Sequence, residues 1–343
     1  MDIKEAILKL ASAAGVSGTE AEAAELAKAM LEPYCKETYI DKRGTVVGIM
    51  GSGNAPVFHL DAHIDRIGLI VTDVAERGFV KFAKCGGIDE RTLAGMEVTI
   101  LGKEPVFGVV SSIPPHLSNA SDEGKAKSCT DLAIDTGLSE DKAKELIRKG
   151  DRAYLKSYPC ELLGGLMSMG ALDDRSGVAC LIKVAELLSE MSNPPAVIFT
   201  FSVLEEVGGK GAATASFDMK PDCSIAVDVS FARTPGCDKS ETAELSAGPM
   251  IGYSPVLEHE FSEKLESIAK INDIPYQKEI MNSRTGTHAD ELAVNAGGVK
   301  TGLISIPLKY MHTPVEVIDP VDVENSAKLI AQFILSEGGA ENA

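Results

Sequence analysis

The sequence predicts an α/β protein with a mostly parallel central sheet flanked by helices and a small β-rich insertion. From Met169 onward, apolar runs of strand length alternate with amphipathic helical runs, which is typical of a parallel sheet covered on both faces. Over residues 68–164, short β-like pieces and many glycines replace that pattern. We therefore expect a larger domain formed by residues 1–67 and 165–343, interrupted by an inserted β-rich domain at 68–164.

The composition limits the class of protein. The chain has 343 residues, more than a single core usually organises, and 44% of them are hydrophobic, as in ordinary globular proteins. It carries 51 acidic against 33 basic residues, a formal charge of −18, which argues against nucleic acid or anionic membrane as a partner. Seven cysteines form no CxxC pair, which favours a reducing cytoplasm over a disulfide framework. No apolar run approaches the length of a membrane span.

Local patterns predict the individual elements. Two helices come first, and the second begins near Thr19, which could form a capping box with Glu22. Residues 37–50 predict a hairpin that turns at 42–44, and residues 56–65 predict a buried strand. The later elements are helices over 139–150, 171–191, 260–271 and 321–335, and strands over 196–204, 223–229 and 299–308.

Histidines and acids follow four of these strands. PVFHLDAHID ends in His63 and Asp65, AVIFTFSVLEE in Glu205 and Glu206, CSIAVDVS in Asp228 and VKTGLISIPLKYMH in His312. A fifth acidic point, Asp173–Asp174, opens a helix. Each alone is more simply explained as a cap, a turn residue or an acid at a helix N-terminus. Because ligands bind beyond the carboxyl ends of the strands in open sheets, we expect all five to meet at one edge.

This set of side chains has the donors of a two-metal site. Two histidines with carboxylates suit zinc, cobalt or manganese, and one carboxylate can bridge two ions about 3.5–4 Å apart that together activate water. In the HxD arrangement, Asp65 lies on the same side as His63 and can orient its ring. If the strand continues through them, Glu205 and Glu206 point in opposite directions, so that one binds metal while the other reaches the water.

Five segments in this order, DAHID, ALDDRSG, LEEVGGKGA, AVD and KYMHTPVEV, resemble the dinuclear metallo-aminopeptidases of the tetrahedral (glutamyl aminopeptidase, "cellulase M") family. The resemblance covers nearly the whole chain. It implies hydrolysis of the N-terminal residue of short peptides with two divalent ions, zinc or cobalt before manganese. It also implies that the insertion is a PDZ-like β domain that makes dimers, which build a twelve-subunit tetrahedron.

The same resemblance implies a role for each site residue. The ligands would be His63, Asp173 and Asp228 for a first ion, and Asp173, Glu206 and His312 for a second. Glu205 would be the general base. Asp65 would accept a hydrogen bond from the ring nitrogen of His63 that does not bind metal. The family also has a cis peptide after the bridging aspartate, which here joins Asp173 to Asp174.

Three positions depart from the family's pattern. Arg66 stands where an acid is usual, the loop 283–290 replaces a Gly-Thr-Asp motif, and Lys309 replaces an arginine. One hypothesis is that Arg66 or Lys309 favours an acidic first side chain in the substrate, and the alternative is that both pair with nearby carboxylates. His288, in the same loop, could be a third-shell group of the metal site or a substrate contact, but it is more simply explained as a hydrogen-bond partner of Asp290, and we do not assign it to metal.

Other protein classes are weaker alternatives. A dinuclear phosphoesterase also uses a D-x-H strand end, but no later Gly-Asn-His segment follows here. A related carboxypeptidase or amide deacylase uses nearly the same ligands, yet its inserted domain normally comes after the Glu-Glu pair. A catalytically inactive assembly protein is a third alternative, and the presence of both glutamates and every ligand position argues against it. The native metal, the preferred first residue and the peptide length stay open.

Overall fold

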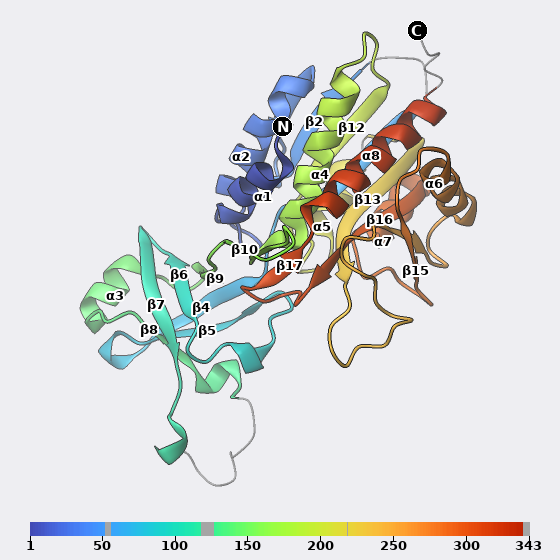
Figure 1. The fold of residues 1–343 in the computed structure, drawn as a ribbon. Coiled ribbons are helices and arrows are strands. Elements are labelled where there is room, and N and C mark those ends of the chain that lie inside the picture. Colours follow the sequence, from blue (N-terminus) through green and yellow to red (C-terminus); the bar gives the residue numbers. More distant parts are fainter. Residues whose placement is uncertain (52–55, 118–126, 218, 339–343) are drawn as a thin grey trace.

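A computed structural model describes residues 1–51, 56–117, 127–217 and 219–338, and an eleven-stranded sheet is its largest element (Figure 1). Its strands lie in the order β1 (Glu37–Ile40), β2 (Val46–Met50), β12 (Ala196–Ser202), β3 (Val57–His63), β13 (Cys223–Phe231), β16 (Lys300–Lys309), β17 (Glu316–Ile318), β11 (Met167–Met169) and β10 (Cys160–Glu161). Beside β16, the strands β14 (Met250–Tyr253) and β15 (Gln277–Ile280) extend the sheet.

The sheet is mixed rather than mostly parallel. Its central strands β12, β3, β13 and β16 pair in parallel, as their continuous apolar runs predicted. The predicted hairpin of β1 and β2 is confirmed and pairs antiparallel, as do the short strands β17, β11 and β10. The prediction misses the other end of the sheet, because β17, β11 and β10, of two or three residues each, carry too little pattern to be recognised.

Helices cover both faces of this sheet. The first set is α1 (Ile3–Ser12), α2 (Ala21–Leu31), α4 (Leu172–Ser189), α6 (His259–Ile271) and α8 (Pro320–Glu337), and the second is α5 (Lys210–Ser216) and α7 (Ala289–Ala293). Neighbouring residues of a strand point to opposite faces. In β13, Ile225 and Val227 accordingly join the large core with the first set, and Ala226 joins a smaller core with α5 and α7. None of the helices in the described ranges is long and apolar enough to cross a membrane.

The expected capping box of the second helix is absent from the described structure. The Thr19 hydroxyl donates to the carbonyl of Val16 at 2.9 Å, and Glu22 accepts the Ala14 N–H at 3.2 Å. Glu20 is the N-cap residue of α2 and makes no side-chain cap hydrogen bond. Both side chains of the predicted box therefore bind main-chain groups of residues that precede the helix, and neither caps it.

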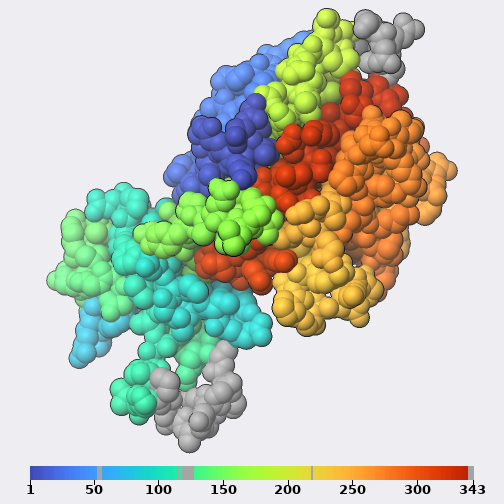
Figure 2. Space-filling view, viewed as in Figure 1, coloured from blue at the N-terminus to red at the C-terminus, as the bar shows by residue number. Residues whose placement is uncertain are grey.

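The insertion forms a closed barrel. Its strands lie in the order β4 (Gly68–Val74), β5 (Val80–Cys85), β8 (Ala133–Asp135), β7 (Pro105–Ser111), β6 (Glu97–Leu101) and β9 (Arg152–Leu155), with α3 (Glu140–Leu146) beside them. The barrel has its own apolar core and projects as a lobe from the main body (Figure 2). All six strands fall within the proposed insertion at 68–164, whereas β10, which also lies in that range, pairs with β11 of the large sheet.

A histidine outside the motifs lies inside the sheet. His59 is completely buried, and its ring nitrogens lie 2.7 Å from Thr200 Oγ1 and 3.2 Å from Ser224 Oγ. Burial, with the nearby His288, lowers the pKa of His59 from an ordinary value of 6.5 to about 3. The folded protein therefore keeps this ring neutral at pH values where the unfolded chain protonates it.

We expect this burial to make the fold sensitive to acid. Above pH 6.5 the ring is neutral in both the folded and the unfolded chain, so His59 adds no pH dependence there. As the pH falls from 6.5 toward 3, only the unfolded chain takes up the proton, and the folded protein loses stability. Within that window, this group lowers the free energy of unfolding by about 1.4 kcal/mol per pH unit. His59→Gln keeps a side chain that can bond both hydroxyls and removes the proton uptake. Urea denaturation between pH 7 and 5 should show a shallower pH dependence for the variant, and equal slopes would contradict this role.

Candidate metal centre

Strand β3 presents the first predicted ligand on its polar face. Leu60 and Ala62 pack in the large core, so the alternating residues Asp61 and His63 point to the opposite face. The strand ends at His63, which is almost completely buried. This imidazole therefore lies at the carboxyl edge of the parallel strands, where the sequence placed the site.

Asp173 lies between two histidines. Its Oδ1 is 2.9 Å from Nε2 of His63, and its Oδ2 is 3.2 Å from Nε2 of His312. Oε2 of Glu206 lies 3.4 Å from the same nitrogen of His312, and Oδ1 of Asp228 lies 3.8 Å from that of His63. The structure thus brings all five predicted ligands together, with one Asp173 oxygen toward each histidine.

A buried glutamate fastens two of these residues. Oε2 of Glu316 accepts the N–H groups of Leu172 (2.8 Å) and Asp173 (3.3 Å), and its Oε1 accepts that of His312 (2.9 Å). Glu316 therefore joins the start of α4 to the turn between β16 and β17. The peptide between Asp173 and Asp174 is cis, which confirms the expectation from the family resemblance. No local pattern in the sequence indicates this role of Glu316, because only folding brings its three partners together.

Asp65 holds the segment that carries the two glutamates. Its carboxylate accepts the N–H groups of Glu205 (2.9 Å) and Glu206 (3.3 Å) and the Ser17 hydroxyl (2.6 Å). Nδ1 of His63 lies 3.1 Å from the main-chain oxygen of Asp65 and 3.5 Å from its Oδ1. Since the main-chain oxygen only accepts, it favours the proton on Nδ1 and leaves Nε2 as the ligand atom. The shorter contact to His63 thus comes from the main chain, not from the predicted carboxylate.

Glu205 and Glu206 do not continue strand β12. The strand ends at Ser202, and Leu204 has a φ of 61°, in the left-handed region. The prediction that strand alternation separates the two carboxylates is therefore wrong. The turn separates them instead, because Glu206 approaches His312, whereas Glu205 belongs to a different group of potential ligands.

His288 belongs to that group, and its simpler interpretation as a hydrogen-bond partner of Asp290 is wrong. Its ring is completely buried, with Nε2 3.2 Å from Oδ2 of Asp61 and Nδ1 3.4 Å from Oδ2 of Asp228. The predicted partner, Asp290, accepts hydrogen bonds within its own loop. One ligand atom each of Glu205, Asp228 and His288 lies within 4.8 Å of the others. His288 thus links Asp61, for which the sequence suggested no role, to a predicted metal ligand.

The barrel contributes one wall of the site. The Gly87 carbonyl oxygen lies 3.1 Å from Nδ1 of His312, and a Cβ atom at Gly87 would lie 2.5 Å from that nitrogen. Only glycine allows this approach of the backbone. The carbonyl favours the proton on Nδ1 of His312 and leaves Nε2 toward Asp173 and Glu206.

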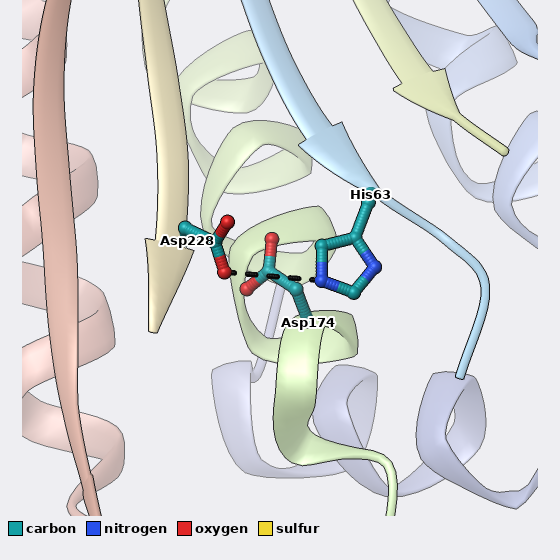
Figure 3. Close-up of side chains that lie close together, drawn as sticks. All are labelled: His63, Asp174 and Asp228. Atoms are coloured by element: carbon teal, nitrogen blue, oxygen red, sulfur yellow. Dashed lines mark ion pairs between the residues drawn. The ribbon is translucent and has the colours of Figure 1, made fainter. Parts of the chain in front are cut away.

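Asp174 is a second candidate beside the predicted ligands. Figure 3 shows it at the start of α4, between His63 at the end of β3 and Asp228 on β13. Its Oδ1 accepts the Gly177 N–H at 3.0 Å. Its Oδ2 is buried and has no hydrogen-bond partner among the described residues. Asp174 thus lies among the potential ligands of one ion only, whereas Asp173 also approaches His312.

The charges of the cluster fit divalent cations. Burial raises the pKa of Glu205 to about 7, and burial together with Asp173 raises that of Glu206 well above its usual range. Burial alone would also raise the pKa of Asp173, but hydrogen bonds from the two histidines lower it. Oε1 of Glu206 is buried without a hydrogen-bond partner in the described part of the chain. Crowded carboxylates with an unpaired buried oxygen are what a cation stabilises.

These residues line a cleft of about 680 Å³. Neither Arg66 nor Lys309 is among the described residues that line it. Arg66 is buried beside the cluster, with its guanidinium 5.2 Å from the centre of the Tyr154 ring and 3.5 Å from the carbonyl oxygen of Leu155. The structure therefore gives no support to the hypothesis that these two cations select an acidic substrate.

Comparison with known proteins identifies the family. Residues 44–329 match the M42 glutamyl aminopeptidase family. A lysyl aminopeptidase of Pyrococcus furiosus is 33% identical over 338 residues, 97% of this chain and 96% of that protein. An aminopeptidase of the archaeon Desulfurococcus kamchatkensis is 34% identical with a TM-score of 0.91, covering 98% of this chain and 95% of that one. The TET1 peptidase of Pyrococcus horikoshii is 31% identical with a TM-score of 0.86, covering 96% of this chain and 98% of that one. That peptidase can assemble into a tetrahedron or a large octahedral shell. The chain therefore belongs to the M42 glutamyl aminopeptidases, a family of hydrolases, as its motifs predicted.

Proposed function

We propose that this protein is a dinuclear metal-dependent aminopeptidase that removes the N-terminal residue of short peptides. The observation that carries the proposal is the position of Asp173, whose two oxygens face His63 and His312 separately. That is the arrangement required of a carboxylate shared by two ions. Membership of the M42 family supports the reaction class.

The proposed ligands are those that the sequence suggested. His63, Asp173 and Asp228 would hold one ion, and Asp173, Glu206 and His312 the other. The main-chain oxygens beside Nδ1 of both histidines, which favour protons there, and the unpaired Oε1 of Glu206 support this assignment. When bound, two divalent ions polarise the peptide carbonyl and lower the pKa of the water that attacks it. Zinc or cobalt suits the mixed imidazole and carboxylate donors best, and manganese is the next candidate.

Glu205 is the proposed general base. It lines the cleft next to Asp228, and burial brings its pKa to about 7, close to the value that suits a base at neutral pH. Its carboxylate would take one proton from the attacking water and give it to the leaving amine. Glu205 therefore ends each cycle in the state in which it began. Asp65 supports this step by fixing the main chain of Glu205.

We also propose a homo-oligomer built from dimers, in which the barrel, as the PDZ-like insertion of the family resemblance, mediates the contact. Strand β7 of the barrel exposes Phe107 and Val109, apolar side chains that a partner subunit would cover. The relative that forms a tetrahedron supports closed assembly, for which the resemblance implies twelve subunits. The seven cysteines are all free, which supports a reducing cytoplasm as the location.

Removal of metal tests the proposed function directly. Dialysis against a chelator should abolish hydrolysis of aminoacyl amides, and zinc or cobalt should restore it. N-acetylated versions of the same amides should resist cleavage, because an aminopeptidase needs the free amine. Activity that survives metal loss, verified by elemental analysis, would contradict metal dependence. Equal cleavage of the acetylated substrates would favour the deacylase alternative.

A further inference from the structure

Beyond the predicted ligands, the walls of the cleft combine apolar side chains with polar and charged ones. The apolar side chains are Val229, Phe231, Met250, Ile280, Met281 and Met311, and the charged ones are Lys239, Glu241, Lys278 and Glu279. Of the two acids, Glu241 is exposed, whereas Glu279, on the edge strand β15, is half-buried. Three methionines give such a wall flexible surfaces that adapt to an extended aliphatic chain.

Two serines fix the carboxylate of Glu279 near the metal centre. Ser305 Oγ donates to its Oε2 at 2.7 Å, and Ser230 Oγ donates to its Oε1. Ser305 is paired with Asp228 in the register of β16 and β13, and Ser230 lies two residues beyond Asp228 on the same face. Glu279 therefore reaches back over the sheet toward a predicted ligand. Its position fits the first side chain of a peptide whose scissile bond lies at the metals.

Glu279 lacks a cationic partner. Among the described residues, no basic side chain forms an ion pair with it, and the adjacent Lys278 instead pairs with Glu266 at 2.8 Å. Each carboxylate oxygen can accept two hydrogen bonds, so both retain capacity after bonding one serine. Burial raises the pKa of Glu279 above its ordinary value, and the hydrogen bonds from the two serines only partly oppose this shift.

We propose that Glu279 selects peptides whose first residue is lysine or arginine, by pairing with the cationic end of that side chain. The inference rests on the proposed aminopeptidase function, which places the first residue in this cleft. The aliphatic stem of such a residue would lie along the methionines, as long basic side chains do on apolar surfaces. Its cation would meet a partly desolvated, preoriented carboxylate, where a charge-assisted hydrogen bond is stronger than at an exposed surface. A glutamate in the same place would face a like charge.

The test compares kcat/KM for lysine, arginine, norleucine, leucine and glutamate chromogenic amides. Norleucine has the stem of lysine without its charge, so the ratio of lysine to norleucine isolates the contribution of the cation. The wild-type enzyme should prefer lysine and arginine. Glu279→Gln should lower kcat/KM for these two by about 10- to 100-fold and change the norleucine and leucine values little. Glu241→Gln is the matched control, because Glu241 is an exposed acid that also lines the cleft.

Each outcome separates this inference from the function on which it rests. An equal loss on all substrates with Glu279→Gln, or a wild-type preference for glutamate, would overturn the selection of cations while leaving the aminopeptidase intact. Metal-loaded wild-type protein that cuts none of the amides would overturn the proposed function itself. If Glu279→Gln does not fold, Ser305→Ala provides the same measurement. It removes one hydroxyl that holds the carboxylate, and an unchanged ratio of lysine to norleucine would then contradict the inference.

Discussion

Replacing Glu205 with glutamine should leave the protein folded and loaded with two ions while lowering kcat by about 10²- to 10⁴-fold, the usual contribution of a positioned acid or base. Glutamine has the shape of glutamate but cannot take a proton from water. Its main-chain N–H can still donate to Asp65, as that of Glu205 does at 2.9 Å. The surrounding segment should therefore stay in place, and the loss should fall on kcat rather than on KM.

Metal content distinguishes the two roles open to Glu205. The carboxylate also lies within ligand distance of Asp228 and His288, so it is itself a conceivable ligand. Elemental analysis of purified Glu205→Gln should give the wild-type amount of metal. Loss of one ion would reassign Glu205 as a ligand, and a kcat near that of the wild type would remove it from the chemistry. Glu241→Gln again serves as the control for an acid of the same cleft.

The fold was predictable where local pattern and topology agree. The continuous apolar runs of β12, β3, β13 and β16 predicted a parallel sheet, and these strands form its centre. The β17–β11–β10 end of the sheet was not predictable, because β10 and β17 owe their pairing to neighbours and not to their own two or three residues. The barrel was anticipated as β-rich, but its closure depends on pairing between distant strands such as β4 and β9.

The site was predictable to the extent that its residues lie at or near strand ends. His63 is the last residue of β3 and Asp228 lies near the end of β13, and the family resemblance added the roles. His288 was missed because its partner Asp61 is 227 residues away, and no local pattern connects them. One signal was nevertheless present in the sequence: Asp61 alternates with apolar residues in β3 and shares a face with His63, so it needed a buried polar partner. Sequence patterns predict the ligands at strand ends, whereas contacts such as that between Asp61 and His288 depend on how distant segments pack.

The remaining ambiguity within the site concerns Asp173 and Asp174, and the two asparagine variants resolve it. In Asp173→Asn, one of the two oxygens that face His63 and His312 becomes an amide nitrogen, which cannot bind a cation. The shared ligand is then lost on one side. We expect at most one tightly bound ion per chain and an activity loss of more than about 100-fold, since losing even an outer partner of a metal site costs 10- to 100-fold.

Asp174→Asn should behave differently, because the environment of Asp174 favours a neutral side chain. Burial, together with the charge of Asp228, raises the pKa of Asp174 well above its usual range. Asparagine resembles the neutral acid, and its oxygen can keep the hydrogen bond from the Gly177 N–H. We therefore expect two bound ions, activity within about tenfold of the wild type, and metal-free protein of about the same stability, because asparagine replaces an acid that its surroundings already keep neutral. Titration of each metal-free variant with zinc or cobalt, followed by calorimetry, measures stoichiometry independently of turnover. If Asp174→Asn loses an ion and Asp173→Asn retains both, the bridge belongs to Asp174, and the assignment based on the two histidine contacts of Asp173 is wrong.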